Sequence, residues 1–472
     1  MTKPRVRKLF LAAAALAVVA GGTAFAVLAR DRREVTTRSA EAYRFYRQGL
    51  ENERRLYHKD ALAAYAKALE LDPHFAMATL RLAGLFAGRD RDRARSLVQC
   101  AAQSREVLNE HERLMLDIAE AELLAGDPKR AAERIRAYVE RFPEDPEGYF
   151  RLAGVLVREG KPDETLATYE RLVALDPNQA IAYNYLGYYF VRRRDFVKGE
   201  DFFKRYRFLA PDQANPYDSL GELYANTGRY AEAEEHLKRA LEIKPDFLPA
   251  VGHLGTLEAS RGNAEGAVTW YRRASDMAET WKERYAFAGA AVMALLDVGR
   301  PEDALALLDE VVAAAPHRDG KDAVVIRWSY LRSRAIVLAL AGRVDEAEAE
   351  LAGLPELPPD LDADGKMALE KSLSGPKAAF ASARGDLEGA VRHFREILAA
   401  ETERGMGDFG YYPSIFRVRA RLADALVALG RREEAREELR PVLAVNPRFA
   451  PALEVLARID GRAAATTGDA GR

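Results

Sequence analysis

The chain has 472 residues, of which 48% are hydrophobic and 31% are charged, and its formal net charge is −2. This composition is too apolar for an intrinsically disordered chain, and the near-neutral charge argues against nucleic acid as a partner, because phosphate binding needs an excess of Lys and Arg. A single compact core would ordinarily divide into domains at this length, unless the chain is built from units that pack only against their neighbours.

The N-terminal element is an apolar segment behind a short basic one. Residues 1–8 contain four Lys and Arg side chains, and residues 9–29 contain no charge. Twenty-one helical residues rise ~30 Å, which matches the hydrocarbon thickness of a bilayer. We therefore expect one transmembrane helix, a signal anchor over 9–29, followed by a linker over 30–41. Basic residues before the segment favour a single-pass protein of the bacterial inner membrane with the following residues on the periplasmic side.

Two alternatives to this anchor stay open. Ala24, Phe25 and Ala26 form a small-x-small site at which a signal peptide could be cleaved, which would release a soluble exported chain. Arg30 and Arg32 stand on the other flank and are compatible with the reversed orientation.

The stretch "NPYDSLGELYANTGRYAEAEEHLKRALEIKP", Asn215 to Pro245, predicts two amphipathic helices. Apolar and small residues at Tyr217, Leu220 and Tyr224 follow the i, i+3, i+7 spacing of one buried helical face. Gly228 interrupts this pattern, since glycine readily adopts the left-handed conformation that ends a helix. A second apolar face follows, and Pro245 disfavours continuation of the second helix.

This stretch recurs with a fixed period. Prolines stand 34 residues apart, at Pro143, Pro177, Pro211 and Pro245. The glycines of the turns keep the same phase, at Gly126, Gly160, Gly228 and Gly262, with Arg194 in the place of one of them. Small residues recur where the second helix must lie close to the first, at Ala131, Thr165, Gly199, Ala233 and Ala267.

With these residues the chain resembles the tetratricopeptide repeat (TPR) family, whose unit is a 34-residue helix-turn-helix. A Leu-Gly element typical of the unit occurs at Leu186-Gly187, Leu220-Gly221 and Leu254-Gly255. The resemblance implies an all-α fold: an α-solenoid of about eleven antiparallel helix pairs over 42–449, forming a right-handed superhelix. A more distant similarity, carried by "YNYLGYYF" and the residues after it, is to bacterial TPR arrays fused to kinase or winged-helix regulatory domains.

Several segments depart from the repeat. The unit that begins near Ala76 has "GRDRDRARS" in its turn region. Residues 354–365 and 403–414 are rich in proline or glycine, and are either loops at which binding takes place or degenerate repeat junctions. We expect residues 450–460 to form a capping helix and residues 461–472 to form a flexible tail.

In the family that the chain resembles, the first helix of each pair lines a concave face that holds proteins or peptides. The resemblance implies a partner-binding groove formed by Phe150, Arg158, Asn184, Tyr188, Arg192, Asp218, Glu222, Asn226 and His253. Each of these side chains could instead lie on a solvated helix face or pack between repeats. The expected partner is a protein or peptide, with no cofactor, no metal and no nucleic acid.

Two short motifs resemble parts of a protein kinase, "HRD" at His317–Asp319 and "DFG" at Asp408–Gly410. The other parts of that site are missing: no glycine-rich phosphate loop precedes them, and Val324 stands where a metal-binding Asn is needed. We interpret both motifs as turns or loops. The sequence therefore predicts a membrane-anchored scaffold without catalysis, and the remaining alternative is an enzyme with an unrecognised site in the 354–365 and 403–414 loops.

Overall fold

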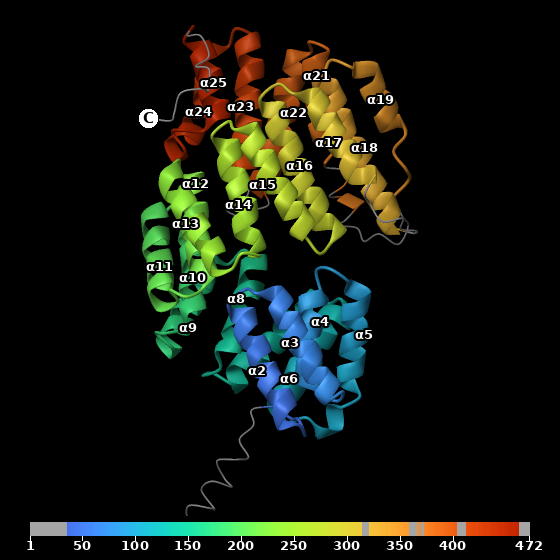
Figure 1. The fold of residues 1–472 in the computed structure, drawn as a ribbon, viewed down its shortest axis with the longest axis vertical. Helices are drawn as coiled ribbons and strands as arrows, with labels where there is room; N and C mark the ends of the chain where they lie inside the picture. The colour runs from blue at the N-terminus through green and yellow to red at the C-terminus, as the bar shows by residue number, and fades with distance from the viewer. Residues whose placement is uncertain are drawn as a thin grey trace, which may run out of the picture. The chain divides into compact units, whose positions relative to one another are not determined.

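The computed structural model describes residues 35–313, 321–357, 366–367, 369, 372–403 and 412–461. In these ranges every regular element is a helix and there is no strand (Figure 1). The predicted all-α fold of successive helix pairs is confirmed. The chain divides into two compact units, one ending at Pro162 and the other beginning at Asp163.

The first unit contains three helix pairs and one further helix. A short 3₁₀ helix, η1, and a π-helix, η2, interrupt the regular order around the third pair. The bounds are α2 Ala40–Arg54, α3 His58–Leu71, α4 Ala76–Phe86, α5 Arg91–Ala102, η1 Arg105–Val107, α6 Glu110–Ala119, η2 Glu120–Ala125, α7 Pro128–Arg141 and α8 Pro146–Arg158. The unit that begins at Ala76 is thus a regular helix pair, with the "GRDRDRARS" stretch forming its turn and the start of α5.

The second unit continues the succession of helix pairs to the end of the described chain. Its bounds are α9 Pro162–Leu175, α10 Ala180–Arg192, α11 Phe196–Leu209, α12 Ala214–Asn226, α13 Tyr230–Ile243, α14 Leu248–Ser260, α15 Ala264–Met277, α16 Trp281–Asp297, α17 Pro301–Ala313, α18 Lys321–Leu340, α19 Val344–Ala352, α21 Ser374–Ala383, α22 Leu387–Glu403, α23 Tyr412–Ala428, α24 Arg432–Val445 and α25 Ala450–Ile459. Consecutive helices pack side by side, as α12 and α13 do (Figure 1).

The turns inside the pairs explain the periodic glycines. Gly228 has φ +80°, a left-handed conformation in which an L side chain is strained. The amide of Arg229 then donates to the carbonyl of Tyr224, which ends the first helix. Arg194 occupies the same place one repeat earlier and has φ +64°, so the turn is kept there without a glycine.

A repeated hydrogen bond explains the recurrence of Tyr and Pro. The hydroxyl of Tyr183 donates to the carbonyl of Pro177 at 3.0 Å, and the hydroxyl of Tyr217 donates to the carbonyl of Pro211 at 3.2 Å. Proline ends the preceding helix because it lacks an amide donor. The tyrosine that opens the next first helix therefore satisfies the carbonyl of that proline.

Close contact within each pair depends on the small residues. Ala233 is fully buried on α13, and a Cβ atom at Gly221 on α12 would lie 2.6 Å from Cγ of Leu237. No side chain fits between the helices at such a distance, so the Leu-Gly element sets how closely the two helices of the pair approach.

The second unit also contains contacts between repeats that are far apart in the sequence. The side chain of Asn446, in the turn before α25, donates to the carbonyl of Ala225 at 3.3 Å and accepts from the hydroxyl of Tyr230 at 3.2 Å. Both Asn446 and Tyr230 are buried. The last repeats therefore pack against the turn between α12 and α13 (Figure 1).

The predicted location in the inner membrane is wrong. Among the described residues no helix combines the length and the apolar character that crossing a bilayer requires. The longest, α18, has 20 residues but carries charged side chains such as Arg327 and Arg332 along its length. The segment predicted as anchor, 9–29, and the basic segment 1–8 lie outside the described residues.

Candidate binding face of the repeats

The first helices α10, α12 and α14 bring most of the predicted groove residues together. Tyr188 of α10, Glu222 of α12 and His253 of α14 are joined in a row, because Tyr188 donates to Glu222 at 2.7 Å and the Nε2 atom of His253 lies 3.7 Å from Glu222. We call the side of the first helices of the second unit that carries these residues the inner face. Asn184 and Asp218 belong to it as well.

The second contact of His253 completes the group. Its Nδ1 atom lies 2.8 Å from the carboxylate of Asp218, so the imidazole is placed between two acids. Ser219, which the sequence analysis did not select, donates to Asn184 at 2.8 Å and so connects α12 to α10. The contacts join residues 34 or 35 apart, which occupy the same or adjacent places in successive repeats.

Electrostatics favour a protonated imidazole in this group. Burial by itself lowers the pKa of His253, but the charges of Asp218 and Glu222 outweigh it and raise that pKa to about 9. Burial and the neighbouring Glu222 raise the pKa of Tyr188. The group therefore consists of a neutral phenol, a cation and two acids near neutral pH, an arrangement suited to binding polar groups rather than to nucleophilic catalysis.

The floor of the inner face is closed off from solvent. Asp218, Glu222 and Asn226 are 2%, 6% and 3% exposed. The Oδ1 atom of Asn226 is buried and has no hydrogen-bond partner within the described ranges. Tyr188, Arg192 and His253 are half-buried and are the more exposed side chains of this face.

A buried ion pair joins distant repeats of the second unit. Asp297, the last residue of α16, accepts a hydrogen bond from Arg417 of α23, and Arg421 lies 3.5 Å from the same carboxylate. The side chains of Asp297 and Arg417 are 9% and 10% exposed. Each of these buried charges needs the other, because either one without its partner would strongly destabilise the fold.

The remaining predicted groove residues, Phe150 and Arg158, lie on α8 of the first unit. Phe150 is half-buried and Arg158 is exposed. Each unit therefore has its own set of candidate residues.

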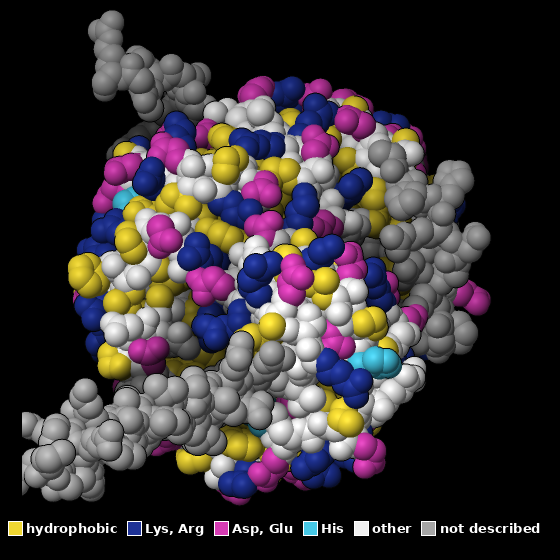
Figure 2. Space-filling view, turned by 60° about the horizontal axis from the view of Figure 1, so that its bottom comes forward, with side chains coloured by type: hydrophobic (Ala, Val, Ile, Leu, Met, Phe, Trp, Pro, Cys, Tyr) yellow, Lys and Arg dark blue, Asp and Glu magenta, His cyan; other side chains and the backbone are white. Residues whose placement is uncertain are grey.

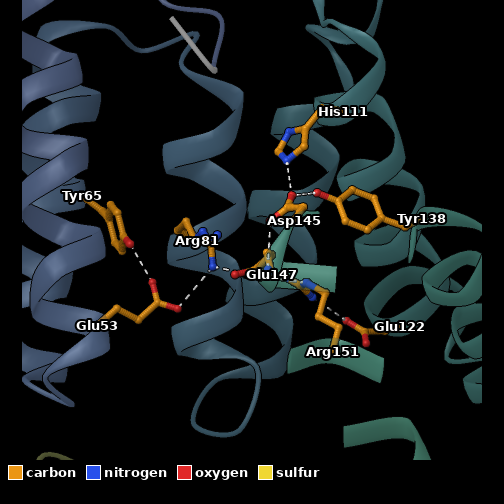
Figure 3. A network of polar contacts seen from close by, with 9 residues as sticks. All are labelled: Glu53, Tyr65, Arg81, His111, Glu122, Tyr138, Asp145, Glu147 and Arg151. Carbon is orange, nitrogen blue, oxygen red and sulfur yellow. Dashed lines mark hydrogen bonds and ion pairs between the residues drawn. The ribbon is translucent and has the colours of Figure 1, made fainter. Parts of the chain in front are cut away.

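The first unit contains a polar network that the sequence analysis missed (Figure 3). Arg81 of α4 lies between two acids, 3.5 Å from Glu53 of α2 and 3.1 Å from Glu147 of α8. Glu147 also accepts from Arg151 at 3.0 Å, and Glu53 accepts from Tyr65 at 2.6 Å. Alternating charges thus connect α2, α4 and α8.

The ionisation of this network follows from its pairing. Burial opposes the charged form of Glu147, but Arg81 and Arg151 outweigh it and lower its pKa to about 2. Burial likewise opposes the charge of Asp145, whereas hydrogen bonds from His111 and Tyr138 lower its pKa (Figure 3). The acids of the network are therefore each paired with a cation or a hydrogen-bond donor, which is typical of a structural role.

A further contact of the first unit involves the segment before α2. The amide and the hydroxyl of Thr36 both donate to Glu112 of α6, at 2.5 Å each, and Thr37 donates to Asp72 at 2.5 Å. Glu112 is fully buried. These contacts attach residues 35–39 to the first unit.

Several sequence-based predictions fall wholly or mainly outside the described residues. These are the "HRD" residues 317–319, the "DFG" residues 408–410, the tail from 462, and most of the loops 354–365 and 403–414. In the part of the chain that is described, no three His, Cys, Asp or Glu side chains are arranged to hold a metal ion.

The surface shows no segregation of charge in the view of Figure 2. Lys and Arg side chains alternate with Asp and Glu across that face, with hydrophobic side chains between them. This mixture agrees with the net charge of −2 and provides no basic stripe on that face for a nucleic acid.

Comparison with known proteins identifies the repeat. Models described as tetratricopeptide repeat match residues 116–179, 155–214, 214–247, 290–361 and 381–459, together more than half of the chain. No curated protein sequence matches the chain.

Three solved structures are among those similar to this chain. PilW, a widely conserved type IV pilus biogenesis factor, is 16% identical with a TM-score of 0.37, over 46% of this chain and 99% of PilW. A tetratricopeptide repeat protein from Parabacteroides merdae ATCC 43184 is 17% identical with a TM-score of 0.36, over 56% and 98%. The MamA protein is 22% identical with a TM-score of 0.29, over 37% and 92%.

Proposed function

Because the chain belongs to the tetratricopeptide repeat family, we propose that it is a protein-interaction scaffold that binds protein or peptide segments on the inner face and has no catalysis of its own. The observation that carries this proposal is the row of polar side chains on successive first helices, from Tyr188 through Glu222 to His253. Polar side chains in register with the repeats can follow a partner's backbone from one repeat to the next.

The accessible residues of this face have suitable chemistry. Tyr188 and Arg192 combine apolar contact area with hydrogen-bond donors, and such residues are enriched where interfaces carry most of their binding energy. His253 adds a positive charge beside two buried acids. A partner segment that meets these three side chains would gain both contact area and directional hydrogen bonds.

A site-specific cross-linking experiment tests the proposal. A photo-reactive benzoylphenylalanine is placed at residue 188 in the full-length chain, and at residue 197 as a matched control. Val197 lies on α11, the second helix of the same repeat, and is 74% exposed. We expect a discrete protein adduct in cells from residue 188 and none from residue 197.

A triple variant provides a second test of the proposed binding face. Substituting Tyr188→Ala, Arg192→Ala and Glu222→Ala together removes two of the three half-buried side chains and one floor acid, and co-purification of the cross-linked partner with this variant should fall at least tenfold. Equal adducts at residues 188 and 197, or undiminished co-purification with a variant whose circular dichroism is unchanged, would show that partners bind elsewhere.

A further inference from the structure

Arg332 of α18 differs from the other buried arginines of the described chain. Its Nε atom is buried without a hydrogen-bond partner, and no hydrogen bond or ion pair connects its side chain to another described residue. Arg81 and Arg417, by contrast, are each paired with an acid. Arg334, two residues further along α18, is paired with Asp309 at 3.1 Å and with Glu350 at 2.9 Å.

The repeat pattern assigns Arg332 to the inner face. It precedes the turn glycine Gly342 by ten residues, as Asp218 precedes Gly228 and as Asn184 precedes Arg194. Residues at the same place in successive first helices face the same side of a repeat array. Arg332 therefore belongs to the same side of the repeats as the group around His253.

The neighbouring first helix, α16, lies beside α18 and carries a glycine at the place equivalent to Arg332. The hydroxyl of Tyr285 on α16 donates to the carbonyl of Ser329 at 2.8 Å and lies 3.0 Å from the hydroxyl of Ser333, so α16 and α18 lie side by side at this level. Gly289, which also precedes its turn glycine by ten residues, occupies the equivalent place on α16. A Cβ atom there would meet nothing within 4 Å.

A guanidinium that has no counter-charge among the described residues is costly to bury in the unbound protein. Burial lowers the pKa of Arg332, and Tyr285 is the neighbour that opposes this shift. A desolvated charge without a counter-charge destabilises a fold, whereas the planar fork of Arg pairs well with a carboxylate. The side chain is only half-buried as a whole, so an incoming group can reach it.

We propose that Arg332 binds a side-chain carboxylate of the partner, which makes the partner an acidic protein segment. This inference rests on the proposed scaffold function, because it names the chemistry of the segment held on the same inner face. The acids of that face do not compete for Arg332: Asp218 and Glu222 are occupied by His253 and Tyr188.

The first test uses the stability of the unbound chain and needs no partner. Arg332→Met removes an uncompensated charge and keeps the length of the side chain, so the melting temperature should rise, by about 2–4 °C. Arg334→Met is the matched control on the same helix; it removes a paired charge and should lower the melting temperature. A fall for Arg332→Met would mean that Arg332 already has an internal partner, and would overturn the inference.

The second test measures binding of a fluorescein-labelled hexaglutamate peptide by anisotropy, with hexaglutamine as the uncharged comparison. We expect the full chain to bind hexaglutamate at least tenfold more tightly than hexaglutamine, Arg332→Met to abolish this preference, and Arg332→Lys to restore part of it. Equal affinities for the two peptides, or an unchanged preference in Arg332→Met, would overturn the inference. Displacement by inorganic phosphate at concentrations where acetate has no effect would overturn the assignment to a carboxylate.

These outcomes are separable from failure of the scaffold function. Cross-linking at residue 188 reports whether the inner face holds a partner at all, and does not depend on the charge at residue 332. Adducts at 188 combined with an unaffected hexaglutamate preference in Arg332→Met would refute the acidic partner and leave the scaffold in place.

Discussion

The contact between the last repeats and α16 is open to a direct test through Asp297. The substitution Asp297→Asn keeps the size of the side chain and removes its charge. It leaves Arg417, whose side chain is 10% exposed, without its carboxylate. Arg421, 3.5 Å from the same carboxylate, loses a neighbour as well but is 25% exposed and can be solvated.

The expected cost follows from this burial. Removing one member of a buried ion pair costs about 3–5 kcal/mol, because the other charge is then buried and uncompensated. Asn retains one hydrogen-bond acceptor, and Glu454 of α25 lies near enough to Asp297 for the two carboxylates to interact. We therefore expect the lower end of this range, about 3 kcal/mol of unfolding free energy.

Urea unfolding followed by circular dichroism measures this loss, with Asp303→Asn as the control. Asp303 is 54% exposed and pairs with Arg300 on the surface, so that variant should lose at most about 1 kcal/mol. Hydrogen exchange of the amides between Ala225 and Tyr230 should also become faster, since Asn446 is held against them by the same repeats. A loss for Asp297→Asn no larger than that of the control would refute the buried pair.

Three further predictions concern single residues. The pKa of His253 is raised from 6.5 to about 9 in the folded chain. Its contribution to the free energy of unfolding, about 3 kcal/mol at most, is therefore complete below pH 6.5 and is lost as the pH rises through 9. Urea unfolding measured over a series of pH values should show this loss, and an identical pH dependence in a His253→Gln variant would contradict it. Ala233→Asp places an unpaired charge in a fully buried contact and should cost about 3–5 kcal/mol in thermal melting, whereas Ala231→Asp on the exposed side of the same helix should be nearly neutral; equal melting of the two variants would show that the buried face is misassigned. Arg194→Gly relieves a left-handed φ of +64° and should stabilise by about 0.5–1 kcal/mol, a gain that chemical denaturation resolves and that a lowered midpoint would disprove.

The inner face was predicted in part from the repeat pattern. The resemblance to the repeat family selected Tyr188, Glu222 and His253 as residues of first helices that line one face, and in the structure they form a connected row. The pattern did not reveal that Asp218 and Glu222 are buried, because burial depends on what packs over a helix as well as on its own sequence. Ser219 was missed because a serine on a first helix has no distinctive spacing of its own.

The polar network of the first unit could not be predicted from the sequence, for another reason. Arg81, Glu53 and Glu147 resemble any other charged residues of amphipathic helices, and such residues are ordinarily solvated. Their pairing depends on α2, α4 and α8 approaching one another (Figure 3). Only the spatial arrangement distinguishes these three from the many exposed ion pairs of the same composition.

The sequence by itself determined the repeat unit of this protein, because the causes of that unit are local. Gly228 and its equivalents form the turns, Gly221 and Ala233 allow the helices of a pair to touch, and the prolines separate the pairs. The tertiary structure alone decided that Asn446 lies against Ala225 and that Asp297 meets Arg417. Such contacts join residues more than 100 positions apart, and they depend on small angles between successive repeats, which add up along the array and leave no periodic signal in the sequence.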